Sequence, residues 1–354
     1  MVAVETIPVV EDEAGMRVDR WFRAHYPDLS FSHLQKLLRS GQIRVDGSRA
    51  KTSTRLEPGQ SVRVPPLSRE PKGAGGTAPH AKGETAARPG EPKATSAAKG
   101  ERTRAPKSTD EKLLRDALLY EDDQVFVFNK PFGLAVQGGS GLTRHVDAML
   151  EAFRDRKGQK PRLVHRLDRD TTGVLVVART RLAASKLAAS FRSRATRKIY
   201  WALVAGVPKP KQGRISTWLA KEGGPEGDRM KVARHGAEDA SHAETLYSVV
   251  DQAGPKLAWL TMRPVTGRTH QLRAHAAHIG HPIVGDPKYF DREDWELPGG
   301  MQNRLHLHAR RIVMPHPSGK GTIDVTAPLP DHMRQSWNLL GFDESMGKDS
   351  DGGE

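Results

Sequence analysis

A long internal stretch without any large apolar side chain sets the architecture of this chain. Between residues 68 and 110 there is no Val, Ile, Leu, Met, Phe, Trp or Tyr, so this stretch cannot contribute to a hydrophobic core. Its prolines, glycines and small residues, with Lys and Arg exceeding Asp and Glu, are typical of a flexible tether. We therefore predict two folded units, over 16–66 and 111–340, joined by a disordered basic linker over 67–110.

The two ends of the chain are acidic. Residues 1–15 carry four acidic side chains and no Lys or Arg, which predicts an acidic N-terminal extension. Secretory signals begin with positive charge and mitochondrial presequences are poor in acids, so neither is expected. Residues 341–354 carry five acids and one lysine without periodicity, and we predict a disordered acidic tail there.

Charge and cysteine content narrow the class of protein. The chain has 56 Lys and Arg against 42 Asp and Glu, a net charge of +14, which favours a nucleic-acid partner. No run of 18 apolar residues suggests a membrane span, and no basic helix with a wide apolar face suggests a lipid surface. The absence of cysteine excludes disulfides, thiolate nucleophiles, Cys-ligated zinc and iron–sulfur clusters, and a cytoplasmic location fits best.

The small unit has the pattern of two helices followed by strands. Apolar residues at helical spacing predict helices around 18–22 and 34–38, the second capped by Ser30 or Ser32 and stopped at Gly41. Alternating residues then predict two strands, with a hairpin turn at Asp46-Gly47. The basic side chains of this unit suit phosphates, although a solvated basic face without a partner is the alternative.

The large unit mixes the two kinds of periodicity without strict alternation. Strand-like runs lie at 125–128, 174–178, 199–204 and 257–262, and helical runs lie at 146–153 and 182–191. This order predicts an α+β domain rather than a doubly wound parallel sheet. The glycines near residue 139 lack the spacing of a phosphate loop, so a nucleotide cofactor has no support.

The densest polar segment is 163–173, which runs into the apolar strand at 174–178. Asp168 lies between Arg166 and Arg169, and nearby cations favour the ionised carboxylate that a nucleophile or an anionic stabiliser requires. A surface ion-pair cluster is the competing interpretation. We expect Asp170 to cap the turn that follows it rather than to act in a pair with Asp168.

A second polar segment, 263–275, predicts a strand, a turn and a helix start. The N–H groups of that helix start, beside Arg268, His270 and Arg273, suit an anion. Aromatic Tyr200 lies in another strand and is explained equally well by core packing or by a site.

Histidines raise the question of a metal. Four of them, His270, His275, His278 and His281, follow one another, but only His275 and His278 share a helical face, and no acid completes a ligand set. We therefore expect no metal site. Further on, Arg304, His306, His308 and Arg310 alternate with apolar residues and predict the polar face of a strand.

Several long motifs in series carry a family resemblance. Segments 129–134, 165–173, 198–200, 266–273 and 280–286 together resemble the RluA family of RNA pseudouridine synthases in order and spacing. The small unit, through 17–20 and 32–47, resembles the "S-four" RNA-binding domain. Two positions depart from the family pattern: Thr172 stands where Ser is usual, and Phe132 is bulkier than the small residue often found there.

The resemblance implies a mixed, mostly antiparallel central sheet flanked by helices, next to a small α/β RNA-binding domain. It implies isomerisation of specific uridines in 23S ribosomal RNA of the large subunit, by base flipping, in a monomeric enzyme without cofactor or metal. Asp168 matches the catalytic aspartate, Tyr200 the residue that stacks on the base, and Arg273 the partner of Asp168. RNA contacts are expected from Arg166, Arg169, Arg268 and His270, and in the small unit from Lys36, Arg39, Arg44 and Lys51.

The motifs leave some alternatives open. Asp168 attacks the ribose, stabilises a cation-like state, or removes a ribose proton. A non-catalytic RNA-binding or ribosome-assembly factor on the same fold is the second hypothesis for function, and an N-glycoside hydrolase that releases uracil is the third.

Overall fold

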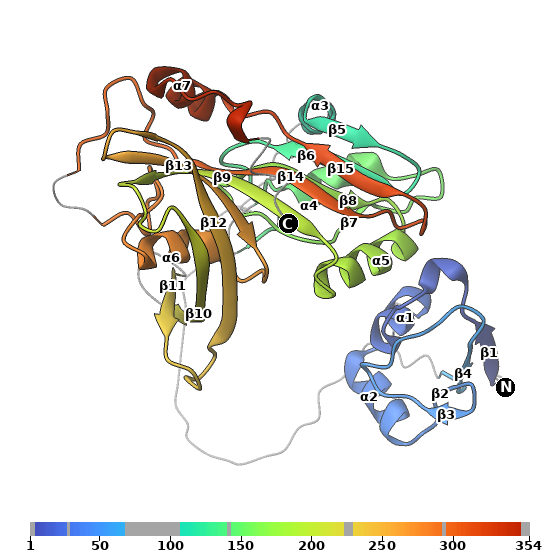
Figure 1. The fold of residues 1–354 in the computed structure, drawn as a ribbon. Coiled ribbons are helices and arrows are strands. Elements are labelled where there is room, and N and C mark those ends of the chain that lie inside the picture. The colour runs from blue at the N-terminus through green and yellow to red at the C-terminus, as the bar shows by residue number, and fades with distance from the viewer. Residues whose placement is uncertain are drawn as a thin grey trace, which may run out of the picture. The chain divides into compact units, whose positions relative to one another are not determined.

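The computed structural model describes residues 4–26, 29–67, 107–139, 143–222, 229–291 and 295–347. The chain forms two compact units, Met1–Pro106 and Lys107–Glu354 (Figure 1). Most of the expected linker, from residue 68 to residue 106, lies outside the described residues, as does the expected tail from residue 348 on. None of the helices described is both long enough and apolar enough to cross a bilayer.

The small unit is a four-stranded antiparallel sheet with two helices and a short 3-10 turn. The sheet order is β1-β4-β2-β3. The elements are β1 (Glu5–Pro8), η1 (Glu11–Glu13), α1 (Val18–His25), α2 (Phe31–Arg39), β2 (Arg44–Val45), β3 (Ser48–Arg49) and β4 (Ser61–Val64). Both expected helices are confirmed, and Ser30 is the cap of α2, because its hydroxyl accepts from the His33 N–H at 3.3 Å. The turn at Asp46-Gly47 is confirmed by positive φ angles of 48° and 76°.

The prediction of a separate N-terminal extension is wrong, because residues assigned to that extension belong to the fold of the small unit. Strand β1 pairs with β4 along its whole length, and Val9 is buried in the core. The buried carboxylate of Glu13 accepts a hydrogen bond from the indole of Trp21 at 2.9 Å and pairs with His25. The prediction relied on the acidic charge of this segment and overlooked its few apolar side chains, which pack into the core of the small unit.

The large unit is built on one mixed sheet of eleven strands. Its order is β11-β10-β12-β13-β9-β14-β8-β6-β5, with β15 beside β14 and β7 beside β8, and β14 with β8 is the parallel pair. The strands are β5 (Leu118–Glu121), β6 (Val125–Lys130), β7 (Arg162–Leu163), β8 (Thr172–Ala178), β9 (Arg197–Ala205), β10 (Gln212–Glu222), β11 (Arg229–Ala233), β12 (Ser241–Ala253), β13 (Leu257–Pro264), β14 (Leu307–Pro315) and β15 (Thr322–Thr326). The α+β class and the four expected strands are confirmed.

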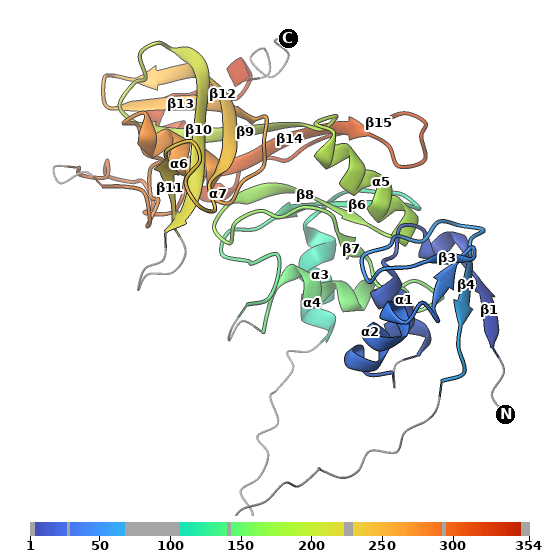
Figure 2. The same ribbon diagram turned by 90° about the horizontal axis from the view of Figure 1, so that it is seen from below.

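Helices cover both faces of this sheet (Figure 2). Against β6 and β8, the elements α3 (Lys107–Asp116), α4 (Val146–Met149) and η2 (Leu150–Phe153) pack on one face, and α5 (Arg181–Arg192) packs on the other. Against β9 and β13, α7 (Asp331–Leu340) and α6 (Gln271–His278) pack on opposite faces. Side chains alternate in direction along a strand, so each strand here is apolar on both faces.

Both boundaries of the large unit differ from the expected ones. Helix α3 begins at Lys107, within the expected linker, because a helix continues through polar residues ahead of its first buried side chain, Leu114. At the other end, Phe342 is 7% exposed and packs against Trp337, with ring centroids 5.7 Å apart. Glu344 pairs with Arg310 at 3.3 Å. A single aromatic residue without periodicity gave no sign of this packing.

Of the four residues expected to form the polar face of a strand, Arg304 is exposed and the other three are buried. His308 and Arg310 are 0% and 7% exposed because β14 lies between β9 and β8 in the interior of the sheet, and His306, directly before β14, is 0% exposed. Hydrogen bonds replace water: His308 bonds the hydroxyl of Thr172 at 2.8 Å, and Arg310 donates to the carbonyl of Ala327 at 2.7 Å.

Candidate active site

A cleft of about 1020 Å³ opens in the large unit where three of the motif segments meet. The loop after β7, the strand β9 and the start of α6 all contribute to its wall. The cleft brings together every side chain that the sequence placed in the catalytic unit: Arg166, Asp168, Arg169, Tyr200, Arg268, His270 and Arg273.

A close approach of two strands fixes the loop that carries Asp168. Gly173 follows this loop and has φ of +106°, and a Cβ atom there would lie 2.2 Å from the carbonyl oxygen of Ala309 in β14. Only glycine fits this position. The parallel pairing of β8 with β14 begins at this contact, so the end of the loop is set by the core of the sheet.

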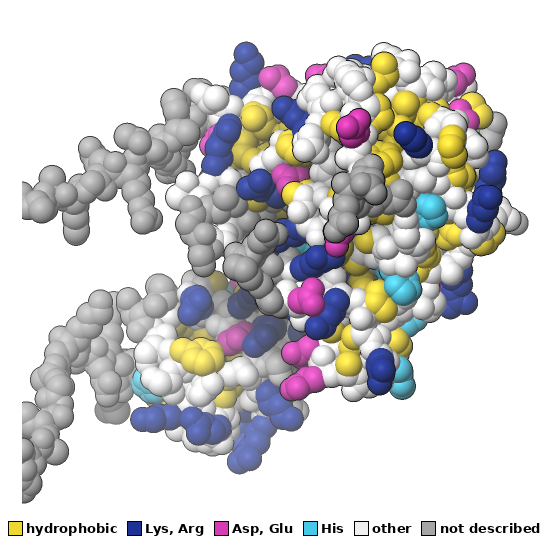
Figure 3. Space-filling model, turned by 90° about the vertical axis from the view of Figure 1, so that its left-hand side faces the viewer, with side chains coloured by type: hydrophobic (Ala, Val, Ile, Leu, Met, Phe, Trp, Pro, Cys, Tyr) yellow, Lys and Arg dark blue, Asp and Glu magenta, His cyan; other side chains and the backbone are white. Residues whose placement is uncertain are grey.

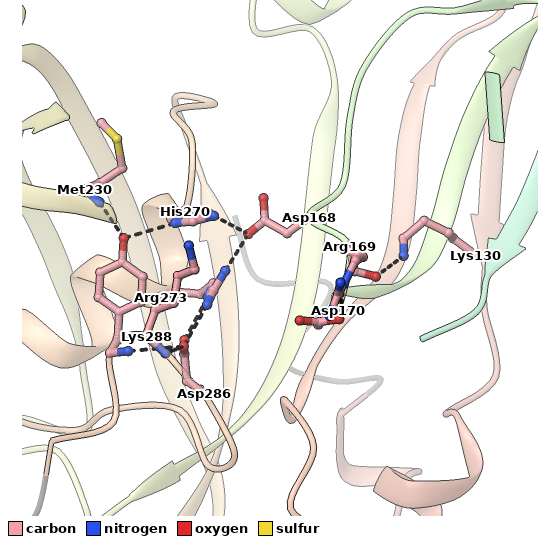
Figure 4. Close-up of polar contacts among 10 residues, drawn as sticks. Lys130, Asp168, Arg169, Asp170, Met230, His270, Arg273, Asp286 and Lys288 are labelled. Atoms are coloured by element: carbon pink, nitrogen blue, oxygen red, sulfur yellow. Dashed lines mark hydrogen bonds and ion pairs between the residues drawn. The ribbon is translucent and has the colours of Figure 1, made fainter. Parts of the chain in front are cut away.

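Asp168 is held by a buried arginine that is itself anchored by a second aspartate (Figure 4). Arg273 Nη1 donates to Asp168 Oδ2 at 3.3 Å, while its Nε and Nη2 donate to the two oxygens of Asp286 at 2.8 and 2.7 Å. Burial alone would lower the pKa of Arg273, but the bonds and charges of Asp286 and then Asp168 raise it. Asp286 is 0% exposed, whereas Asp168 is 27% exposed and faces the cleft.

The cation beside Asp168 therefore comes from α6 and not from its sequence neighbours. Arg169 reaches Asp170 at 3.2 Å, and Arg166 is exposed at the cleft. The expected cap by Asp170 is wrong, because its carboxylate takes this ion pair, and the N–H of Thr171 bonds the carbonyl of Asp168 at 3.2 Å.

A second chain of polar groups reaches Asp168 through His270, beside Arg273 (Figure 4). The backbone N–H of Met230 donates to the hydroxyl of Tyr289 at 2.7 Å, and this hydroxyl lies 3.1 Å from His270 Nδ1. Burial is the main reason that the pKa of His270 is lowered, so the ring is neutral near pH 7. A neutral ring that accepts at Nδ1 carries its proton on Nε2, which points at Asp168 Oδ2 from 3.8 Å.

Tyr200 borders the Asp168 site, which favours the functional interpretation of this aromatic residue. It lies in β9 on the face that α6 covers, and its side chain lines the cleft. Burial, and then the charge of Asp168, raise the pKa of its phenol above the usual 10.0. The group is therefore a neutral ring and hydroxyl at pH 7.

Two further groups of the site were not assigned from the sequence. Lys130 is 1% exposed, and its ammonium group donates to the carbonyls of Pro131, Leu134 and Arg169, which ties the Asp168 loop to the end of β6. Burial lowers the pKa of Lys130 to about 7 against the opposing charges of Asp170 and Asp168. Thr171 lines the cleft, and its buried hydroxyl has no hydrogen-bond partner among the described residues.

The histidines do not converge on one point. His275 lies between the hydroxyls of Thr217 and Thr245, and His281 bonds the carbonyl of Ala205. Within the described ranges, no three His, Asp or Glu side chains are grouped so that they could hold a metal ion.

Comparison with known proteins decides the family. A model of the RNA pseudouridylate synthase family matches residues 124–278. Ribosomal large subunit pseudouridine synthase C of Vibrio vulnificus is 34% identical over 94% of this chain and 95% of its own length. The Escherichia coli K12 protein of the same name is 34% identical over 96% of this chain and 97% of its own length.

This chain belongs to the RNA pseudouridylate synthase family. The solved structure of human RNA pseudouridylate synthase domain containing 4 agrees, with a TM-score of 0.57 and 28% identity over 67% of this chain and 97% of that one. The pseudouridine synthase fold expected from the motifs is confirmed. The departure at Thr172 keeps a hydroxyl, and that hydroxyl bonds the buried His308.

In this pseudouridine synthase, Asp286→Asn is expected to cost about 3–5 kcal/mol of unfolding free energy, because it leaves a buried guanidinium without its main counter-charge. Urea unfolding of the two proteins measures the loss. Asp324→Asn is the matched control: Asp324 also binds an arginine through both oxygens, Arg311 at 2.7 and 2.6 Å, but this pair is partly exposed and is expected to contribute less than about 1 kcal/mol. Equal losses in the two variants would show that Asp286 is not an anchor.

Proposed function

We propose that this protein converts specific uridines of large-subunit ribosomal RNA to pseudouridine, with Asp168 as the catalytic residue. The observation that carries the proposal is a carboxylate exposed to a large cleft and fixed by a buried arginine, in a cleft that Tyr200 also lines. The names of the two bacterial relatives support ribosomal RNA of the large subunit as the substrate. Such a substrate implies an enzyme of the cytoplasm, and the proposed form is a monomer.

The proposed reaction conserves every atom of the uridine. The bond from N1 to the ribose breaks, the base turns, and C5 bonds the same ribose carbon, so no oxidant, reductant or group donor is consumed and no cofactor is proposed. In the proposed roles, Asp168 attacks or stabilises the ribose carbon or removes a ribose proton, and Arg273 keeps it ionised and oriented. His270 supplies a second N–H toward the same oxygen.

Tyr200 is proposed to stack on the flipped base. Its raised pKa makes the phenol a poor base while Asp168 is charged. Burial, the larger cause of the raised pKa, does not depend on the charge of Asp168. The proposed role of Tyr200 is therefore stacking on the base rather than removal of the C5 proton.

The exposed cations at the cleft are proposed to hold the RNA backbone. Arg166 and Arg169 lie on the Asp168 loop, and Arg268 lies before α6, where its Nε bonds the carbonyl of His242 at 3.0 Å. Guanidinium groups at the mouth of the cleft can bind phosphates on either side of a flipped uridine.

The small unit is proposed to bind RNA as S-four domains do. Lys36, Arg39, Arg44 and Lys51 are all exposed, and Figure 3 shows Lys and Arg side chains, in dark blue, on this unit. Arg44 lies directly opposite Arg49 on β3 and opposite Arg63 on β4, so three arginines share one face of the sheet. Like charges in register are unfavourable, which supports an anionic partner for this row.

Removal of residues 1–106, which ends just before α3, is expected to weaken binding of the RNA and to flatten its salt dependence. The slope of log K against log salt should become less steep by about 3, since each phosphate contact contributes roughly 0.7–0.9. A full-length variant with Lys36, Arg39, Arg44 and Lys51 changed to Gln is the control and should show most of this change, because Arg49 and Arg63 remain in it. Filter binding over a salt series measures both, and equal slopes for all three proteins would refute the assignment.

The proposed function is tested with purified protein and ribosomal RNA that lacks the modification. We expect new pseudouridines at a small number of positions, mapped by chemical stops, and the loss of the same positions in a strain without the protein. A complete map from that strain with no missing position would overturn the proposal.

A further inference from the structure

A second pocket borders the Asp168 site and has no role in the mechanism above. Its volume of about 410 Å³ lies in the range of small-ligand sites. Three aromatic rings and four polar side chains contribute to its lining: Phe132, Phe290, Trp295, Asp170, Asp286, Asn303 and Arg304. Aromatic rings and an arginine beside hydrogen-bonding groups are the chemistry that binds unpaired nucleobases.

The aromatic side chains of this pocket already form contacts with one another and with Arg304. The guanidinium of Arg304 lies 5.2 Å from the ring centre of Phe132, and the ring of Phe132 meets the edge of His332 at 5.6 Å. Phe290 and Trp295 form a second aromatic pair at 5.3 Å. Arg304 is exposed, and in the part of the chain that the structure describes no carboxylate pairs with it. Phe132 is also the position where this chain is bulkier than the family pattern.

The loop that carries Asp168 lines both the pocket and the cleft, and Asp286 is important for both. Asp170 lines the pocket and Asp168 lines the cleft, and two residues span at most about 7 Å. The lining of the pocket also includes Asp286, whose carboxylate holds Arg273 against Asp168. A ligand in the pocket therefore lies beside the reacting uridine, close enough to be part of the same RNA strand.

We propose that this pocket binds the base of one unpaired nucleotide that neighbours the target uridine. The base stacks on the aromatic rings beside Arg304, and the Asp170 oxygen that Arg169 does not contact accepts a hydrogen bond from the base. A carboxylate accepts from the amino groups of cytosine, adenine or guanine and also from the ring N3–H of uracil. The position of the bound base is identified by the second test below. This inference rests on the proposed function for the identity of the RNA.

The first test compares the affinity of full-length variants for a large-subunit RNA fragment. Phe132→Leu, which keeps the apolar volume but removes the ring, and Arg304→Gln should each raise Kd roughly tenfold, as expected for a lost stacking contact. Arg115→Gln is the matched control, because Arg115 lies over Phe153 at a similar 5.1 Å but on α3, outside both pockets. An unchanged Kd for Phe132→Leu and Arg304→Gln overturns the proposal.

The second test identifies the occupant. Single abasic nucleotides are placed within about three positions of the mapped uridine, and Kd is measured with wild type and with Phe132→Leu. We expect one position where the missing base costs wild type roughly tenfold and the variant less than about twofold. If every missing base raises Kd by the same factor in both proteins, the proposal is overturned. A pocket that holds only a phosphate would give this result. Failure of wild type to form pseudouridine refutes the proposed function instead, while the Kd comparison of the first test is still decisive for the pocket.

Discussion

Asp168→Asn is expected to abolish pseudouridine formation, lowering the single-turnover rate by roughly 10⁴-fold or more, the scale seen when a nucleophile is removed. The side-chain amide keeps the size of the carboxylate and can still accept from Arg273, but it neither attacks the ribose nor stabilises a developing cation. Arg273 keeps both bonds to Asp286, so the fold and the shape of the cleft should persist. The rate is measured on unmodified ribosomal RNA with pseudouridine mapped by chemical stops.

The control for this variant is Asp331→Asn, which removes a carboxylate that is 99% exposed on α7 and should leave the rate unchanged. Full activity in Asp168→Asn would refute the assignment of the catalytic residue. The same samples separate the other hypotheses for function. Free uracil in the wild-type reaction would indicate a hydrolase, and a growth defect of the deletion strain that Asp168→Asn rescues fully would indicate an assembly factor.

The burial of Asp286 explains why a carboxylate as exposed as Asp168 can be positioned at all. A surface arginine would give Asp168 little orientation, because exposed ion pairs are weak and adopt many geometries. Arg273 is fixed on the protein side by two bonds to a fully buried partner and has one nitrogen left for the cleft. Tyr289 adds to this by lying 5.2 Å under the same guanidinium while it orients His270. The site is therefore preorganised by groups that touch no substrate.

Local patterns account for the parts of this molecule that were predicted correctly. Helix α2 with its Ser30 cap, the Asp46-Gly47 turn and strand β8 follow from apolar spacing and turn chemistry over a few residues. Long motifs brought Asp168, Tyr200 and Arg273 to one site although 105 residues separate the first from the last. These features needed no knowledge of which strands pair.

The errors arose where packing over long distances decides. Phe342 has no periodic neighbours, yet it fills a place beside Trp337 that only the folded sheet creates. His308 and Arg310 alternate with apolar residues as a solvated face would, but β14 lies inside the sheet. Lys130 gave no signal of its own, because a lysine at the end of a strand is usually solvated.

Buried histidines are expected to make the large unit sensitive to mild acid. His275, His306 and His308 are all 0% exposed, and burial lowers their pKa values to about 4, 4 and 3, from 6.5 in an unfolded chain. Below pH 6.5 the unfolded state therefore binds protons that the folded state does not, and stability falls as the pH falls. At about pH 5.5 each histidine costs about 1.4 kcal/mol relative to about pH 7.5, and the three together about 4 kcal/mol.

Urea unfolding at the two pH values, followed by tryptophan fluorescence, measures this loss. His275→Gln tests the cause, because an amide can bridge the hydroxyls of Thr217 and Thr245 as the neutral ring does, but it cannot take up a proton. The variant should lose about 1.4 kcal/mol less stability between the two pH values than wild type does, whatever its stability at about pH 7.5. Carboxylates do not account for such a loss, since Asp and Glu in the unfolded chain remain ionised at about pH 5.5. Equal unfolding free energies at both pH values would mean that these histidines reach solvent. An unchanged pH dependence in His275→Gln would show that His275 does not contribute to the loss of stability.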